Sequence, residues 1–365
     1  MNGNWVISKK GHASVPLQLF WIRAFRISPY STVVWFALVF WRLIYCLTFV
    51  SLVSLSMLLN FSASAVRLAV LVALLSSVPA CAPQQADDRS AATPAAEYRA
   101  FGAPQRVTIR GYDGDAMEPF ITKDGQYLLF NNRNDPRTNT NLHFAARVDG
   151  LTFQYRGEIK GVNTPVLEGV PSLDRDGNLF FVSVRSYQET LSTLYRGRFN
   201  DGTVTGVELV AGVSQRKPGI VMFDAEISAD GRTLFVVDGL FTGGPNPKTA
   251  DIVIAVHDGT GFKRLPASAD LLRNINTKGL EYAPAISSDL LELFFTRIPV
   301  SSGTPQPLIL RSTRRSIEDP FGLPEKVAAI TGFVEAPTLT HDGRALYFHK
   351  LEGNRFVIYR VTRQI

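Results

Sequence analysis

A segment of 13 residues recurs five times along this chain, and this repeat restricts the fold more than any other feature of the sequence. Each copy contains an aspartate, followed in four copies by glycine, and these aspartates are Asp124, Asp176, Asp230, Asp289 and Asp342. Their numbers differ successively by 52, 54, 59 and 53. The copies are Glu118–Phe130, Val170–Val182, Asp224–Val236, Ala283–Phe295 and Ala336–Phe348.

Each copy has the pattern of a β-hairpin. An Ile or Leu stands three residues before the aspartate, whose side chain caps a turn, and the glycine supplies the positive φ that such turns need. An apolar triplet such as Leu128–Phe130 follows, which predicts a strand buried on both faces. The fourth copy has Leu290 in place of the glycine, so we expect its turn to be of a different type.

A second pair of predicted strands follows each of the first three hairpins, with turns at Asp149–Gly150, Asp201–Gly202 and Asp258–Gly259. Four strands in 50 to 60 residues are typical of one propeller blade. After the fifth hairpin only one strand remains, Phe356–Val361, and we expect Gln105–Ile109 to supply the missing one. The sequence therefore predicts an all-β fold, a β-propeller of five four-stranded blades over residues 103–365, with the ring closed by a strand from the other end of the chain.

The repeats resemble the PD40, or WD40-like, repeats of TolB-type propellers. The matching element is Pro-x-[Ile/Leu]-[Ser/Thr]-x-Asp-Gly, and four copies carry its proline, as Pro119, Pro171, Pro284 and Pro337. The resemblance spans residues 104–363 and implies the fold, which hosts many unrelated functions. No α/β domain precedes the repeats and their number is five rather than six, so the resemblance does not extend to TolB's partnership with the Tol–Pal machinery.

The segment before the repeats reads as a leader in two apolar blocks. Residues 33–59 are long enough to span a bilayer, and residues 66–80 have the order of a secretory signal, with one basic residue, a short apolar run and small residues. Val78–Cys81 resembles a bacterial lipobox, which implies a diacylglycerol on Cys81 and cleavage before it. Residues 81–102 are expected to form a flexible tether. Residues 1–65 are interpreted as upstream sequence translated in error, or as carrying a membrane helix over 33–59.

Charge and cysteine content exclude several classes of function. Six basic residues and no acidic ones lie in residues 1–81, and removing those six from the 38 basic residues leaves 32, equal to the acidic total. A neutral mature part lacks the positive field that binds nucleic acid. Both cysteines, Cys46 and Cys81, precede the repeats, so the propeller has no disulfide and no cysteine-based zinc site. We predict no cofactor and no metal, and we expect His341 and His349 to be surface turn and strand-end residues.

Acidic residues precede the predicted hairpins, on the strands that line a propeller's channel. Counted back from the turn aspartate most stand at even offsets and so share a face, whereas Glu335 is expected on the other face. Basic residues end the second strands in four copies, including Lys350. The candidate channel or ligand residues are Glu118, Arg133, Glu168, Arg185, Asp224, Glu281, Arg297 and Glu335, with Glu226 beside them.

Two interpretations of these residues remain open. In one, acids and bases pair with each other and hold the blades, and the protein is a lipid-anchored, monomeric binding or interaction scaffold of the bacterial cell envelope, periplasm-facing or on the surface, with an envelope protein or a glycan as partner. In the other, channel carboxylates serve a carbohydrate-active hydrolase or lyase, which needs a protonated acid and an ionised partner about 5 to 10 Å apart. The polar loop Asn131–Asn141 is the candidate contact with a ligand or partner. No catalytic residue is assigned, and the sequence favours the non-enzymatic interpretation.

Overall fold

The computed structural model describes residues 99–134, 139–243, 246–300 and 306–364. This part of the chain is almost entirely β-structure, with two one-turn helices, α1 (Tyr187–Thr190) and α2 (Ser268–Leu271). No helix within it is long and apolar enough to cross a membrane. The predicted leader helix at 33–59, the signal at 66–80 and the lipidation site Cys81 lie outside the described residues.

Twenty of the 21 described strands form five groups of four antiparallel strands, which we number as blades 1 to 5, and the remaining strand, β2 (Thr108–Arg110), is added to blade 1. Blade 1 consists of β3 (Met117–Ile121), β4 (Tyr127–Asn131), β5 (Leu142–Arg147) and β6 (Thr152–Glu158). Blade 2 consists of β7 (Glu168–Leu173), β8 (Asn178–Ser183), β9 (Leu194–Asn200) and β10 (Thr203–Leu209). Blade 3 consists of β11 (Ile220–Ile227), β12 (Thr233–Leu240), β13 (Thr249–His257) and β14 (Phe262–Arg264). Blade 4 consists of β15 (Leu280–Ile286), β16 (Glu292–Ile298), β17 (Leu308–Thr313) and β18 (Glu325–Lys326). Blade 5 consists of β19 (Val334–Leu339), β20 (Ala345–Glu352), β21 (Arg355–Thr362) and β1 (Gln105–Arg106).

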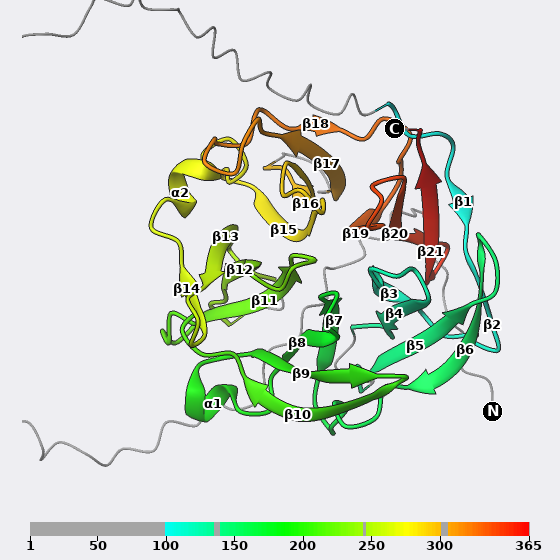
Figure 1. Ribbon diagram of the computed structural model, residues 1–365, viewed down its shortest axis with the longest axis horizontal. Coiled ribbons are helices and arrows are strands. Elements are labelled where there is room, and N and C mark those ends of the chain that lie inside the picture. Colours follow the sequence, from blue (N-terminus) through cyan, green and yellow to red (C-terminus); the bar gives the residue numbers. More distant parts are fainter. Residues whose placement is uncertain (1–98, 135–138, 244–245, 301–305, 365) are drawn as a thin grey trace, which may run out of the picture. The chain divides into compact units, whose positions relative to one another are not determined.

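The blades are arranged around a common centre with β3, β7, β11, β15 and β19 innermost (Figure 1). A single parallel pairing, Ala250 with Leu280, joins blades 3 and 4 into one continuous sheet. Apolar side chains fill the space between neighbouring blades, as where Phe180 of blade 2 meets Phe262 of blade 3 edge to face at 5.7 Å. The prediction of an all-β propeller is confirmed, because each repeat supplies a hairpin whose second strand is buried on both faces.

Ring closure differs in detail from the expectation. Only Gln105 and Arg106 pair with β21 of blade 5, whereas β2 (Thr108–Arg110) pairs in parallel with β6 of blade 1. The segment thus crosses from the last blade to the first, and the buried Val107 between the two strands donates its N–H to the carbonyl of Ile358. Phe101, which we expected in the tether, packs on Phe294 of blade 4, so the domain includes it.

Each innermost strand contains a β-bulge, which the sequence did not predict. In four blades the bulged residue precedes the repeat's proline and has a positive φ, between 48° and 56°: Glu118, Val170, Ala283 and Ala336. Blade 3 has no proline there, and its register shift lies between Met222 and Asp224. Because a bulge adds one residue, it reverses the alternation of side chains between the two faces of the strand.

The turn of the fourth repeat keeps the conformation of the others. Leu290 has φ +63°, close to the +71° of Gly231 and the +69° of Gly343 at the same position. The Asp289 carboxylate caps the turn by accepting the N–H of Leu291 at 3.0 Å. The expectation of a different turn type is therefore wrong: the leucine adopts the left-handed conformation that glycine adopts more easily.

Candidate functional site

Glu168, a predicted channel residue, is held within the protein rather than offered to a ligand. It is fully buried at the start of β7, and its carboxylate accepts the N–H and the hydroxyl of Thr164, both at 2.7 Å. The hydroxyl of Ser183 also donates to it at 2.7 Å, and Arg185 forms a salt bridge at 3.2 Å. The Arg185 guanidinium lies 4.8 Å from the ring of Tyr195. These partners surround the Glu168 carboxylate and leave no side of it open to a substrate.

Glu281 repeats this arrangement in blade 4. It is fully buried, accepts the N–H and the hydroxyl of Thr277 at 3.0 and 2.7 Å, and forms a salt bridge with Arg297 at 2.6 Å. In both cases an asparagine stands just before the threonine. Its side-chain amide accepts the N–H and donates to the carbonyl of one residue in the preceding blade, as Asn276 does with Ile252. We call these two arrangements, Glu168 with Thr164 and Arg185 and Glu281 with Thr277 and Arg297, the Glu168 and Glu281 clamps. The pattern Asn-Thr-x-x-Leu-Glu, at 163–168 and 276–281, is the sequence signal that could have identified them.

The bulges are fixed by hydrogen bonds between neighbouring blades. Each left-handed residue donates its N–H to a side chain of the preceding blade, which leaves no bulge amide unpaired at these four positions. The donor–acceptor pairs are Glu118 N with His349 Nδ1 at 3.1 Å, Val170 N with Asn131 Oδ1 at 3.1 Å, Ala283 N with Asp224 Oδ2 at 2.9 Å and Ala336 N with Thr296 Oγ1 at 3.0 Å. Between blades 2 and 3 the hydroxyl of Ser172 accepts the N–H of Ile227 at 2.9 Å.

Three of the predicted carboxylates form one group on the innermost strands. Glu118 of blade 1 interacts electrostatically with Asp224 of blade 3 and with Glu335 of blade 5. Glu335 accepts the hydroxyl of Tyr282 from blade 4. The expectation that Glu335 lies apart from the others is wrong, because the bulge after it reverses the alternation on which that expectation depended.

Burial shifts the ionisation of this group, which we call the axial cluster (Glu118, Asp224, Glu335 and Tyr282). Desolvation raises the pKa of Glu118 well above its usual value, and the charges of Asp224 and Glu335 raise it further. Desolvation also raises the pKa of Asp224 to about 7, although the N–H of Ala283 opposes the shift. The pKa of Tyr282 is raised well above its usual 10, first by burial and then by Glu335. Near neutral pH the axial cluster therefore holds protons that exposed carboxylates would release.

His349 joins the axial cluster, contrary to the expectation of a surface strand end. It is fully buried, and its Nδ1 accepts the N–H of Glu118, so its Nε2 carries the proton and donates it to Glu335 at 3.2 Å. His341 is exposed, as expected, beside Ser288. His349 stands seven residues after its turn aspartate, where other copies have Asn131, Ser183 and Thr296, and this polar position after an apolar triplet is a signal that sequence reasoning missed.

Two further candidate residues, Arg133 and Glu226, also pair with charged side chains. Arg133 forms a salt bridge with Asp115 at 2.8 Å. Glu226 accepts Lys123 of blade 1 at 3.1 Å and the hydroxyl of Ser172 at 2.7 Å, so it links blades 1, 2 and 3. Of the polar loop 131–141, residues 135–138 lie outside the described part. Among the described residues no group of three or more His, Cys, Asp or Glu side chains could hold a metal ion.

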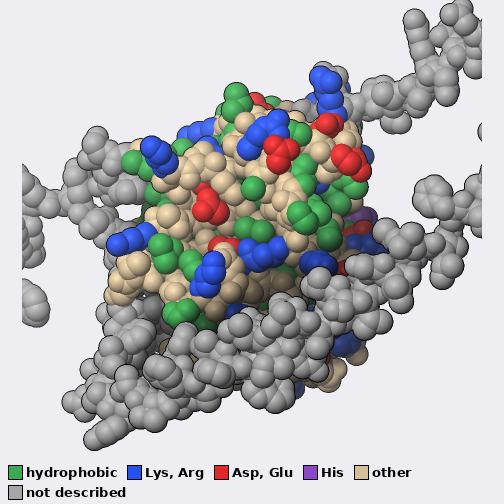
Figure 2. Space-filling model, turned by 90° about the vertical axis from the view of Figure 1, so that its left-hand side faces the viewer, with side chains coloured by type: hydrophobic (Ala, Val, Ile, Leu, Met, Phe, Trp, Pro, Cys, Tyr) green, Lys and Arg blue, Asp and Glu red, His purple; other side chains and the backbone are tan. Residues whose placement is uncertain are grey.

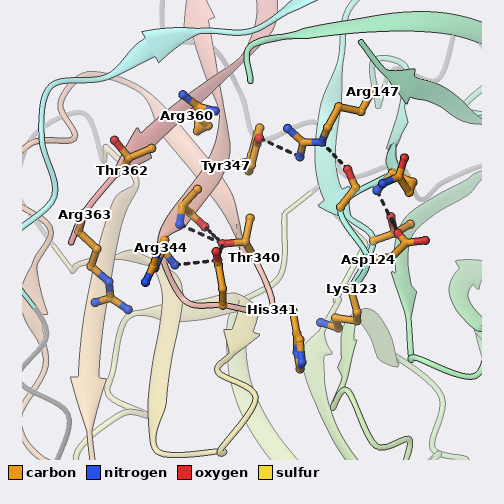
Figure 3. A pocket seen from close by; sticks show the side chains of 15 residues that line it. Lys123, Asp124, Arg147, Thr340, His341, Arg344, Tyr347, Arg360, Thr362 and Arg363 are labelled. Atoms are coloured by element: carbon orange, nitrogen blue, oxygen red, sulfur yellow. Dashed lines mark hydrogen bonds between the residues drawn. The ribbon is translucent and has the colours of Figure 1, made fainter. Parts of the chain in front are cut away.

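Two grooves lie on the side of the propeller that carries the repeat turns. The first, with a cavity of about 600 Å³, separates blades 5 and 1, and we call it the 5/1 groove. Figure 3 shows Arg147 extending from blade 1 toward Tyr347, with Arg360 beside it on blade 5. The second, of about 430 Å³, lies between blades 1 and 2 and is lined by Tyr127, Phe199 and carboxylates such as Asp201. The labelled lining residues of the 5/1 groove are Lys123, Asp124, Arg147, Thr340, His341, Arg344, Tyr347, Arg360, Thr362 and Arg363.

On the side face shown in Figure 2, basic and acidic side chains are interspersed with apolar and uncharged ones. This mixture agrees with the balanced charge of the residues after position 81. Concentrated positive charge is therefore a local property of particular sites, and not of this face as a whole.

No protein-family model and no curated protein sequence matches the chain. Among solved structures it is similar to TolB from Acinetobacter baumannii, with 15% identity and a TM-score of 0.40 over 69% of this chain, which spans 55% of that TolB chain. It is also similar to a GH62 α-L-arabinofuranosidase catalytic domain from Coprinopsis cinerea (10% identity, TM-score 0.48, 73% of this chain and 98% of that one). A family 117 glycoside hydrolase from Zobellia galactanivorans matches with 12% identity and a TM-score of 0.48 over 73% of this chain and 92% of its own. These similarities concern the fold alone, and the similar structures include TolB proteins, whose propeller repeats the sequence resembles.

Proposed function

We propose that this chain is a non-enzymatic binding or interaction scaffold, a monomeric propeller of the bacterial cell envelope tethered to a membrane by a lipid on Cys81. The proposal rests on the bonds that the channel carboxylates form within the protein. Glu168 and Glu281 are enclosed in clamps, Asp224 accepts a bulge amide from the next blade, and Glu335 accepts Tyr282 and His349. Carboxylates used in this way hold blades together instead of meeting a substrate.

The second candidate is a carbohydrate-active hydrolase or lyase, and one observation favours it. Glycoside hydrolysis needs a carboxyl group that stays protonated near neutral pH, and burial raises the pKa of both Glu118 and Asp224. Glu118 is only partly buried, and no hydrogen bond of its carboxylate occurs among the described residues. It is the residue on which such an activity would depend.

Turnover measurements on the full-length protein, purified in detergent, separate the two candidates. Incubation with a panel of polysaccharides and aryl glycosides should give no product, while a glycan array or crosslinking to envelope proteins should reveal binding. Glu118→Gln should leave that binding unchanged. Release of sugar by the wild type that Glu118→Gln abolishes would overturn the scaffold and establish the hydrolase.

A further inference from the structure

The 5/1 groove contains two arginines that are partly buried without an acidic partner. Arg147 donates to the carbonyl of Asp149 at 3.3 Å and to the hydroxyl of Tyr347 at 3.3 Å. Arg360 donates to the carbonyl of Gly150 and to the side chain of Gln105 at 3.1 Å. Neither forms a salt bridge with a described carboxylate. The Nε of Arg147 also donates to the carbonyl of Gly125, and its guanidinium lies 4.9 Å from the ring of Phe153. Both guanidinium groups thus reach the turn at Asp149–Gly150, and their charge faces carbonyls, a hydroxyl, an amide and a ring rather than a carboxylate.

The Nε of Arg360 is a further group of this side chain that lacks a partner. This N–H is buried and has no hydrogen-bond acceptor among the described residues. Buried donors left unpaired are rare in folded proteins. The hydrogen bonds that Arg360 makes within the described part of the chain therefore leave its guanidinium incompletely paired.

Other charged side chains near the groove already have partners within the protein. Lys123 pairs with Glu226 at 3.1 Å, and Arg363 pairs with Glu292. Asp124 and Asp342 cap their own turns, Asp124 by accepting the N–H of Gln126 at 3.0 Å. The carboxylates of Asp124 and Asp342 line the groove, but its basic lining residues Lys123, Arg147, Arg344, Arg360 and Arg363 outnumber them.

Arg344 adds a third positive charge on the rim of the groove. Its side chain is exposed and makes no hydrogen bond or salt bridge in the described part of the chain. It lies near enough to Asp342 to help lower the pKa of that carboxyl. Arg344 is therefore available to close over a ligand held by the two inner arginines.

We propose that the 5/1 groove binds an oxyanion, the phosphate or carboxylate group of a small acidic ligand, between Arg147, Arg360 and Arg344. Guanidinium groups match such anions with paired, charge-assisted N–H···O bonds. A cavity of about 600 Å³ has room for a ligand larger than the anion itself. The inference rests on the proposed function, because it names the ligand class of the binding scaffold.

Isothermal titration of the full-length protein in detergent tests this, with inorganic phosphate and glucuronate as separate probes at constant ionic strength. The test variant is Arg344→Gln. The matched control is Arg232→Gln, since Arg232 follows the same Asp-Gly turn in blade 3, is also exposed, and does not line the groove. At least one probe should bind, Arg344→Gln should weaken it about tenfold, as loss of one charge-assisted bond implies, and Arg232→Gln should leave it unchanged.

Each outcome of this titration either supports or contradicts an oxyanion site in the 5/1 groove. The stronger probe identifies the anion as tetrahedral phosphate or planar carboxylate. The absence of saturable binding by both probes up to about 10 mM, or equal weakening by Arg344→Gln and Arg232→Gln, overturns the oxyanion site. That result would leave the scaffold proposal standing, because the scaffold depends on the channel carboxylates, whereas hydrolysis of a glycan would overturn the scaffold and leave the groove unaffected.

Discussion

The carboxyl group of Asp224 is buried between blades 3 and 4 and accepts the N–H of Ala283 at 2.9 Å. Burial raises its pKa to about 7, whereas an unfolded aspartate titrates near 3.8. Between these two values the folded protein binds more protons than the unfolded chain, so the free energy of unfolding falls as pH rises and levels off above about 7. Glu118 acts in the same direction, because its pKa is raised too.

We therefore predict that the melting temperature falls between pH 5 and pH 8 and that Asp224→Asn flattens this dependence. The asparagine keeps an oxygen for the Ala283 amide but carries no charge, so the variant should be more stable than wild type at pH 8, by on the order of 1 kcal/mol. Thermal denaturation followed by circular dichroism across the pH range measures both effects. A wild type that becomes more stable as pH rises over this range would contradict the prediction.

The Glu168 clamp should contribute far more to stability than an exposed ion pair does. Arg185→Ala leaves the fully buried Glu168 without its cation, and removal of one partner of a buried pair costs about 3–5 kcal/mol. Arg273→Ala is the control, since Arg273 pairs with Asp270 on the surface, where such pairs are worth about 0–1 kcal/mol. Urea denaturation of both variants tests this; equal, small losses would show that the clamp does not hold the blade.

At the scale of strands, one segment crosses from blade 5 to blade 1. Its strand β1 pairs with β21, its strand β2 pairs with β6, and Val107 lies between β1 and β2. This valine is buried among residues of both blades, including Ile121 and Ile358. Val107→Ala should cost about 1–2 kcal/mol, in proportion to the methyl groups removed from a packed core. Hydrogen exchange should quicken first in β1 and β21, whereas Val300→Ala, at an exposed position, should change neither stability nor exchange. Uniform quickening over all five blades would argue against a local opening at the ring closure.

The hairpins could be predicted from sequence because their signals are local. Asp-Gly turns, apolar triplets and a repeat of 52 to 59 residues specify strands and their order without knowledge of the tertiary contacts. The bulge could not be predicted by counting alternate residues, since one inserted residue moves Glu335 into the group with Glu118 and Asp224. The partners of His349 were likewise out of reach, because pairing between blades depends on the closed ring, whereas the partners of Glu168 lie nearby in the sequence.

For the whole molecule, the closed ring explains why many polar side chains of the described strands are buried. Every boundary between neighbouring blades is crossed by a hydrogen bond, donated by a bulge residue at four boundaries and by Ile227 between blades 2 and 3, so the innermost strands are tied around the circle. In the scaffold that we propose, the carboxylates there hold the blades together, and a ligand would contact the grooves between the turns. The proposed tether on Cys81 would then set how these grooves are oriented at the membrane.

Cys81→Ser tests the tether. If a diacylglycerol on Cys81 is the anchor, the wild-type protein should partition into the detergent phase of Triton X-114 and the variant into the aqueous phase, because the acyl chains contribute about 0.8 kcal/mol per buried CH₂. If residues 33–59 are translated and span the bilayer instead, both proteins should stay in the detergent phase, since about 20 apolar residues suffice to hold a chain there. Mass spectrometry of the mature N-terminus separates these cases independently: a lipidated peptide beginning at Cys81 supports the lipid anchor, and an unmodified peptide from residues 1–56 contradicts it.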